Sequence, residues 1–117
     1  MASPLPLELK EIISGAAGVF CNDYELSLIT EKTGWNEQAI LGQTPLLVVT
    51  LGAKGSRIAT KDGVIDVAAV PIEKLVDPTG AGDAHRAGFV KGMLAGLSLK
   101  ECGQLASTVA AYAVEHQ

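Results

Sequence analysis

The sequence predicts an α/β fold in which helices pack on a layered β-sheet. Segments with the apolar spacing of helices alternate with short apolar runs, an order that is typical of such sheets. The run Leu46–Leu51 is apolar except for Thr50, as expected of a strand buried on both faces in a parallel sheet. With 117 residues, of which 48 % are hydrophobic, the chain suits one globular domain with a core.

The N-terminal part of the chain predicts one strand among three helices. Apolar spacing indicates a helix over Leu7–Ile13, and the run Gly18–Cys21 suits a short buried strand. Asn22 then opens a second helix that stops at Gly34. A shorter helix is expected over Asn36–Leu41, where a glycine again follows the last residue.

The middle of the chain predicts more strand structure. The turn sequence Lys61-Asp62-Gly63 indicates a β-hairpin between Arg57–Thr60 and Val64–Val67. A further strand is expected to lead to Val76, immediately before a glycine-rich turn.

Two helices are expected to complete the chain, over Ala81–Leu94 and Leu99–Glu115. Ser98 and Glu101 form a capping box at the start of the second of these helices. Three glycines at a spacing of four in and after the first helix predict close packing against a neighbouring helix: Gly88, Gly92 and Gly96.

Charge and composition argue against several classes of function. The net charge is −4 and no cluster of Lys or Arg stands out, which argues against a nucleic-acid partner. No apolar run approaches the roughly 20 residues that span a bilayer, and the N-terminus has no signal-peptide pattern. Cys21 and Cys102 form no paired motif, so we expect free thiols in a reducing cytoplasm.

The glycine-rich turn before Asp83 is the strongest candidate for chemistry. Backbone N–H groups of Gly80, Ala81 and Gly82, at the start of a helix, form a site for an anion. A carboxylate beside an anion site makes sense if Asp83 takes a proton from a hydroxyl that then attacks a bound phosphate. In the simpler alternative, the turn only joins strand to helix and Asp83 stabilises the helix dipole.

The longer segment Asp77–Asp83, with Ala87–Val90 after it, resembles the second signature of the PfkB (ribokinase-like) carbohydrate kinases. The resemblance implies that Asp83 is the catalytic base. It also implies that the amides of Gly80–Asp83 form the anion hole for the transferred phosphoryl group. Asp77 occupies a position linked with a monovalent cation such as K⁺, although an Asp before Pro also forms turns.

Two other segments resemble motifs of the same family. Asn22 and Glu25 resemble an Asn-x-x-Glu motif of the family that helps to place Mg²⁺ and the phosphates, largely through water. The same pair can also form a capping box at the start of a helix. The two roles are compatible. Thr50, Gly52 and Gly55 match a Thr-x-Gly-x-x-Gly segment that meets the nucleotide phosphates and ribose. Its alternative is a plain glycine-rich turn.

The order of the three motifs matches the C-terminal half of the family, and their surroundings look most like its adenosine-kinase-like members. The resemblance implies a partial three-layer α-β-α ribokinase-like fold, consisting of the C-terminal half of the sheet with flanking helices and a β-hairpin. Residues 1–117 would then be a single partial domain without the N-terminal substrate and lid half. We therefore expect marginal stability of the isolated chain, or association as a homodimer.

The resemblance implies an ATP-dependent phosphotransferase that uses Mg²⁺ and acts on a hydroxyl of a sugar or nucleoside such as adenosine. The alternative is a nucleotide-binding fragment or regulatory homologue without turnover. His85 stands where the family often has Phe or Tyr, and we interpret it as a packing residue rather than a second base. We expect His116 to be solvated and Trp35 to cover a small hydrophobic surface.

Overall fold

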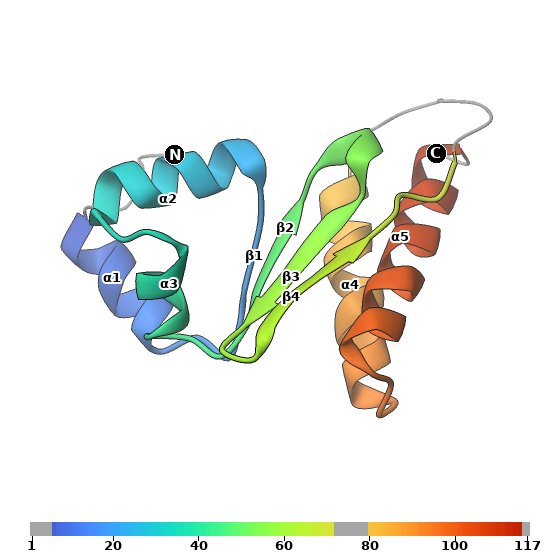
Figure 1. Cartoon of the computed structure of the whole chain (residues 1–117). Coiled ribbons are helices and arrows are strands. Elements are labelled where there is room, and N and C mark those ends of the chain that lie inside the picture. Colours follow the sequence, from blue (N-terminus) through green and yellow to red (C-terminus); the bar gives the residue numbers. More distant parts are fainter. Residues whose placement is uncertain (1–5, 72–79, 116–117) are drawn as a thin grey trace.

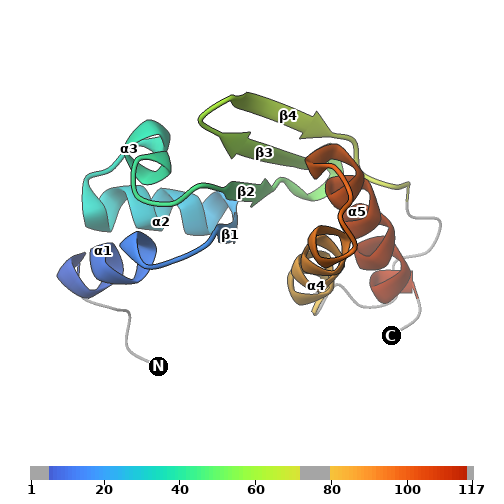
Figure 2. The same ribbon diagram turned by 90° about the horizontal axis from the view of Figure 1, so that it is seen from below.

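The computed structural model describes residues 6–71 and 80–115, which form three layers (Figures 1 and 2). The middle layer is a four-stranded sheet with the order β1-β2-β3-β4. Its strands are β1 (Val19–Asn22), β2 (Leu47–Thr50), β3 (Ser56–Thr60) and β4 (Gly63–Val67).

Helices cover both faces of the sheet, and Figure 2 shows the two groups on opposite sides of it. One group contains α1 (Pro6–Ser14), α2 (Asp23–Thr33) and α3 (Glu37–Leu41). The other group contains α4 (Ala81–Leu94) and α5 (Leu99–Glu115). A single turn of 3₁₀-helix, η1 (Gly52–Lys54), follows β2. These bounds agree with the helices, the first two strands and the hairpin predicted from the sequence.

Strand β2 contributes to both hydrophobic cores. Leu47 and Val49 belong to the core under α1–α3, whereas Val48 packs with Phe89 of α4. Successive strand residues point to opposite faces, so a run without polar interruptions fills both cores at once. The three β2 side chains are at most 1 % exposed, and burial of each stabilises the fold by about 1.5–3 kcal/mol.

The sheet is mixed rather than parallel throughout. β2 runs parallel to β1 on one side and antiparallel to β3 on the other, and β3 pairs antiparallel with β4. The apolar run therefore predicted burial on both faces correctly, but it carried no information about the direction of the neighbouring strands. In the parallel pair, Asn22 lies directly opposite Thr50, so the carboxyl ends of β1 and β2 meet at one edge.

Helix α4 packs closely against α5. A Cβ atom on Gly88 would lie 3.1 Å from Cα of Ala106, and one on Gly92 would lie 3.0 Å from Sγ of Cys102. The predicted close packing is thus confirmed for two of the three glycines. Gly96 instead follows the C-terminus of α4 with a φ of +79° and has nothing near its Cβ position.

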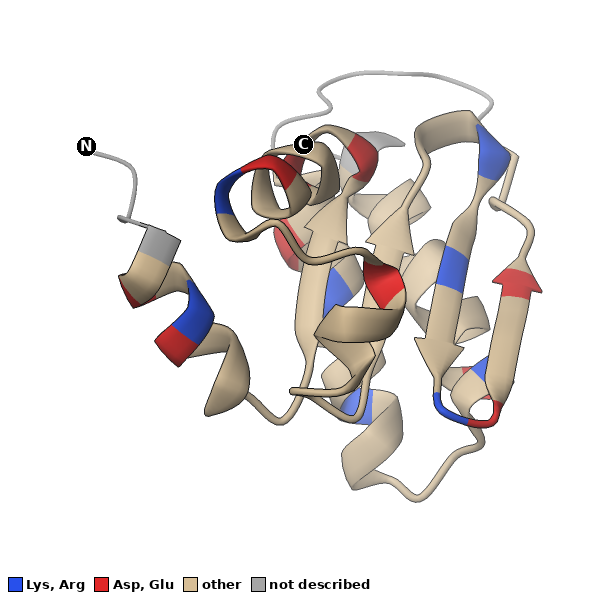
Figure 3. Cartoon of the chain, turned by 60° about the vertical axis from the view of Figure 1, so that its left-hand side comes forward, with Lys and Arg blue, Asp and Glu red and all other residues tan. Residues whose placement is uncertain are grey.

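Several side chains outside the site also have defined places. Trp35 packs against the core under α1–α3, and the Lys10 ammonium lies 5.5 Å from the centre of its ring. Figure 3 shows acidic and basic residues interspersed over helices and strands, and an ion pair between Arg57 and Glu37 joins β3 to α3. Cys21 and Cys102 are buried free thiols.

Some expectations fall outside the described residues. These are the strand leading to Val76, the cation role of Asp77 and the exposure of His116. Among the helices of the described ranges, none has the length and apolarity to cross a membrane.

Candidate functional site

The carboxyl ends of β1 and β2 face the N-terminus of α4 across a cavity of about 290 Å³. The edge-to-face contact of Phe20 with Phe89, whose ring centres are 5.3 Å apart, fixes α4 against β1 at this place. We call this space the carboxylate cavity, after the two acidic residues among its polar lining side chains: Asn22, Glu25, Thr50, Asp83, His85 and Arg86.

Asn22 and Glu25 enter the carboxylate cavity from the junction of β1 and α2. The Glu25 amide donates to Asn22 Oδ1 at 2.7 Å, and the Asn22 amide donates to Glu25 Oε1 at 2.9 Å. The predicted capping box is therefore confirmed, and it orients the two side chains that the sequence also assigned to a metal. Capping engages one carboxylate oxygen of Glu25, so the box does not exclude a ligand role.

The amides in the first turn of α4 have the geometry of a candidate anion site. Gly80 is the N-cap residue, with a φ of +85°, and has no side chain to cap the helix. Its carbonyl accepts the first hydrogen bond of the helix, from the Ala84 amide. The amides of Ala81, Gly82 and Asp83 come before this bond and have no partner within the helix. A Cβ on Gly82 would meet nothing within 4 Å, so a ligand can approach this backbone closely.

Asp83, in the same turn, lines the carboxylate cavity. Its Oδ1 accepts a hydrogen bond from Arg86 Nη2 at 2.9 Å, one helical turn further on. Arg86 was not predicted as a site residue, although its i,i+3 spacing from an acidic residue is a recognisable signal. The pair places a positive and a negative group side by side at the mouth of the anion site.

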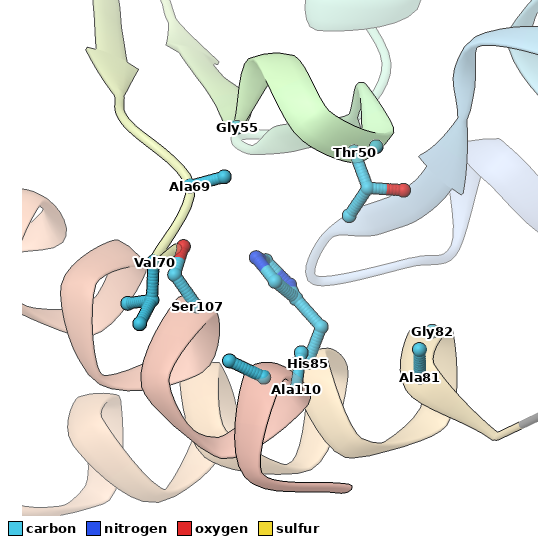
Figure 4. A pocket seen from close by; sticks show the side chains of 11 residues that line it. Thr50, Gly55, Ala69, Val70, Ala81, Gly82, His85, Ser107 and Ala110 are labelled. Carbon is cyan, nitrogen blue, oxygen red and sulfur yellow. The ribbon is translucent and has the colours of Figure 1, made fainter. Parts of the chain in front are cut away.

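A second cavity, of about 200 Å³, adjoins the first and has mainly small apolar walls (Figure 4). We call it the alanine cavity, because four of its lining residues are alanines: Ala69, Ala81, Ala110 and Ala111. Thr50, Gly52 and Gly55 also line it, so the predicted Thr-x-Gly-x-x-Gly segment forms one wall. The contributions of Ala69, Val70 and α5 were not predicted from the sequence, because they arise from packing of distant segments.

Gly55 holds the loop after β2 in shape. Its φ is +95°, and a Cβ atom would lie 1.9 Å from the carbonyl oxygen of Val67. The Leu51 amide donates to the Gly55 carbonyl at 2.8 Å, which closes the turn around η1. A glycine is therefore needed here for backbone packing, and the resulting tight turn places Thr50 at the junction of both cavities.

His85 lies where the two cavities adjoin and lines both of them. Its side chain is 6 % exposed, and its Nε2 atom has no hydrogen-bond partner among the described residues. Burial lowers the pKa of the imidazole, so the ring is neutral at pH 7. The predicted buried position is confirmed, but an unpaired buried polar atom costs about 1–3 kcal/mol.

Cys21 reaches the carboxylate cavity from β1 but is not equipped as a nucleophile. Burial, with smaller contributions from the carboxylates of Glu25 and Glu37, raises the pKa of its thiol to about 12. The reactive form of cysteine is the thiolate, so this thiol stays inert at neutral pH.

The residues suit a sparse magnesium site better than a closed metal cage. The described ranges contain no group of three or more His, Cys, Asp or Glu side chains arranged to hold a metal. Mg²⁺ takes one or two carboxylates and keeps water and phosphate oxygens as its other ligands. Glu25 and Asn22, oxygen donors beside an open anion site, fit that pattern.

The structure therefore brings the predicted residues together in two adjoining spaces. Asn22, Glu25 and Asp83 line the carboxylate cavity, Gly52 and Gly55 line the alanine cavity, and Thr50 lines both. Of the anion-site residues, Gly80 lines the carboxylate cavity, Ala81 lines the alanine cavity, and Gly82 lines both. This arrangement can hold an elongated ligand with an apolar end and an anionic end beside a carboxylate.

Known proteins share both the sequence and the fold. The chain matches the family model described as pfkB family carbohydrate kinase over residues 1–117. It is 36 % identical over 107 residues to a nucleoside kinase of Methanocaldococcus jannaschii and 40 % identical over 110 residues to one of Methanothermobacter thermautotrophicus. These matches cover 92 % and 94 % of this chain but only 35 % of either relative, so the chain spans about a third of their length.

A solved structure gives the same picture. The nucleoside kinase of Burkholderia thailandensis in complex with inosine is 37 % identical and superimposes with a TM-score of 0.94. The match covers 97 % of this chain and 38 % of that chain. The observed layers therefore correspond to part of the ribokinase fold, as the sequence predicted.

Proposed function

The chain belongs to the pfkB family of carbohydrate kinases, and we propose that it forms the nucleotide-binding and base-carrying part of an ATP-dependent phosphotransferase. One observation carries the proposal: Gly80, Gly82 and Asp83, at the start of α4, line the same cavity. The acceptor in this proposal is a hydroxyl of a nucleoside or a sugar. A nucleoside is favoured because the relatives named above are nucleoside kinases and one was solved with inosine.

Each group at the start of α4 has a chemical role in this proposal. The amides of Ala81, Gly82 and Asp83 face the oxygens of the transferred phosphoryl group, where negative charge is held during transfer. Asp83 accepts the proton of the attacking hydroxyl, and its exposed side chain is accessible to that hydroxyl. Arg86 holds the carboxylate by one hydrogen bond until the acceptor arrives.

ATP and Mg²⁺ are the nucleotide and metal of the proposal. Asn22 and Glu25 would hold Mg²⁺, largely through water, and the ion would neutralise charge on the phosphates. Thr50, Gly52 and Gly55 form the wall beside the nucleotide. Asp77 is proposed to contribute to a site for a monovalent cation such as K⁺.

The proposed base is tested by Asp83→Asn, which keeps the size of the side chain but removes its basicity. Release of ADP is measured in the full protein with Mg²⁺, ATP and adenosine, inosine or ribose. We expect kcat to fall by about 10²–10⁴-fold, the usual value of base catalysis. The control is Asp62→Asn in the exposed turn of the hairpin, which is expected to keep full activity. A fall of less than about tenfold in Asp83→Asn excludes Asp83 as the base.

A second candidate function is nucleotide binding without turnover. It concerns the chain by itself, which spans 35 % of the length of these relatives. Titration of the purified chain with ATP and Mg²⁺, with and without an acceptor, separates the two. Binding without ADP release supports the binding module, and release that depends on one acceptor supports the kinase.

A further inference from the structure

The two cavities share Thr50, Gly82 and His85 in their linings, so they lie side by side and together form one candidate site. Each alone, at about 290 and 200 Å³, is small for a ligand the size of a nucleotide. One end of the joined site has small apolar walls, and the other end has an anion site with carboxylates. A nucleotide matches this division, with its base at the apolar end and its phosphates at the other.

His85 lies at the point where such a ligand passes from one cavity to the other. Figure 4 shows its ring pointing into the alanine cavity, between Thr50 and Ser107. The residue is only 6 % exposed. Its Nε2 atom has no hydrogen-bond partner among the residues that the structure describes.

A packing role alone does not explain an imidazole at this place. An apolar ring would fill the same space without leaving a buried nitrogen unpaired, and such a nitrogen destabilises the ligand-free chain. Because His85 lines both cavities, a ligand bound there can supply the missing hydrogen-bond partner. The neutral ring carries one N–H donor and one acceptor, so it can pair with an oxygen without adding a charge.

We propose that His85 is a nucleotide-binding residue whose Nε2 atom hydrogen-bonds an oxygen at the junction of ribose and phosphate. The inference rests on the proposed function, because it requires that a nucleotide occupies the joined cavities. The nucleotide would then be held by the amides in the first turn of α4 and also by a polar side chain in the second turn of the same helix. His85 is a binding residue in this proposal and takes no part in the proton transfer assigned to Asp83.

The first test compares the affinity of the purified chain for ADP with Mg²⁺ before and after His85→Phe, by isothermal titration calorimetry. We expect the Kd to rise by about threefold to tenfold, the value of one hydrogen bond. Unfolding of the nucleotide-free variant is expected to occur at a higher temperature, because an unpaired polar ring becomes apolar. A pure packing role predicts no loss of affinity.

The control is Ser56→Ala. Ser56 is 2 % exposed and its Oγ also lacks a partner among the described residues, but it lines neither cavity. Removing this hydroxyl is expected to leave the Kd unchanged. A loss equal to that of His85→Phe would show that burial of any unpaired group affects binding indirectly, which would overturn the assignment to His85.

A second measurement needs no variant and covers the case in which His85→Phe fails to fold. The ring ¹⁵N signals of His85 are followed by NMR in the wild-type chain during titration with ADP and Mg²⁺. We expect Nε2 to shift in proportion to saturation; saturation without a shift overturns the inference while the proposed function stands. If the folded wild-type chain binds no ADP, the proposed function fails and the inference fails with it.

Discussion

The ion pair between Asp83 and Arg86 is an example of how little one surface contact contributes to stability. Nη2 and Oδ1 lie 2.9 Å apart, but the side chains are 82 % and 56 % exposed. Exposed pairs of this kind contribute about 0.2–1 kcal/mol. An incoming phosphate or hydroxyl can therefore displace the contact at low cost, as the proposed role of Asp83 as a base requires.

Cys21 provides a prediction about pH. Its folded-state pKa is raised from 9.0 to about 12, mainly by burial, so the folded chain keeps a proton that the unfolded chain releases. The stabilisation from the buried thiol is complete below pH 9, and it is lost as the pH rises from 9 towards 12. The free energy of unfolding should therefore fall over that range, by at most about 1.4 kcal/mol per pH unit from this group.

Urea unfolding of wild-type and Cys21→Ala chains at pH 7, 9 and 10.5 measures this effect. All other ionisable groups are common to both chains, so the difference between the two isolates Cys21. We expect the variant to lose less stability than the wild type between pH 9 and 10.5. Parallel losses in the two chains would contradict the raised pKa.

At the scale of single elements, the turn between β2 and β3 depends on one glycine. In Gly55→Ala the new Cβ would lie 1.9 Å from the Val67 carbonyl oxygen, at a φ of +95°. Strain at such a backbone conformation costs about 1–3 kcal/mol, and the clash adds to it. We expect the variant to lose more than about 3 kcal/mol of stability, or to fail to fold.

Gly52→Ala is the matched control for this prediction. Gly52 lies in the same turn with a φ of +60°, but nothing lies within 4 Å of its Cβ position. Its cost should be limited to the backbone term, about 1–2 kcal/mol, in the same denaturant titration. Equal losses in the two variants would mean that the contact with the Val67 carbonyl does not limit the turn.

Element boundaries were predictable where local chemistry sets them. Asn22 marks the start of α2 and Gly34 its end, each through hydrogen bonds within a few residues. Ser98 with Glu101 caps the start of α5 in the same way. The directions of the strands next to β2 were not predictable from its apolar run. Burial on both faces comes from helices above and below the sheet, and these cover parallel and antiparallel pairs alike.

At the scale of the whole molecule, site residues in local motifs were predicted from the sequence. Site residues that are placed by the packing of distant segments were missed. Asn22, Thr50 and Asp83 lie in short motifs, so the resemblance of these motifs to those of the family indicates a role for each residue. Ser107 reaches the site because α5 packs on the hairpin, where a Cβ on Gly103 would come within 2.8 Å of Val67 Cγ2. Such a contact joins segments that are distant in the chain, and no local pattern encodes it.

The exposed surface of the whole chain supports a last prediction, that the isolated chain associates. β1 is an edge strand of the described sheet, and edge strands offer unpaired backbone groups to another chain. Large apolar side chains are exposed as well: Leu94 at 85 %, Leu7 at 69 % and Ile12 at 61 %. Analytical ultracentrifugation should therefore detect a homodimer or larger species whose fraction rises with protein concentration. Where α4 forms part of the contact between chains, Leu94→Glu should lower that fraction. A monomer with a sharp, concentration-independent unfolding transition of high stability would contradict this prediction.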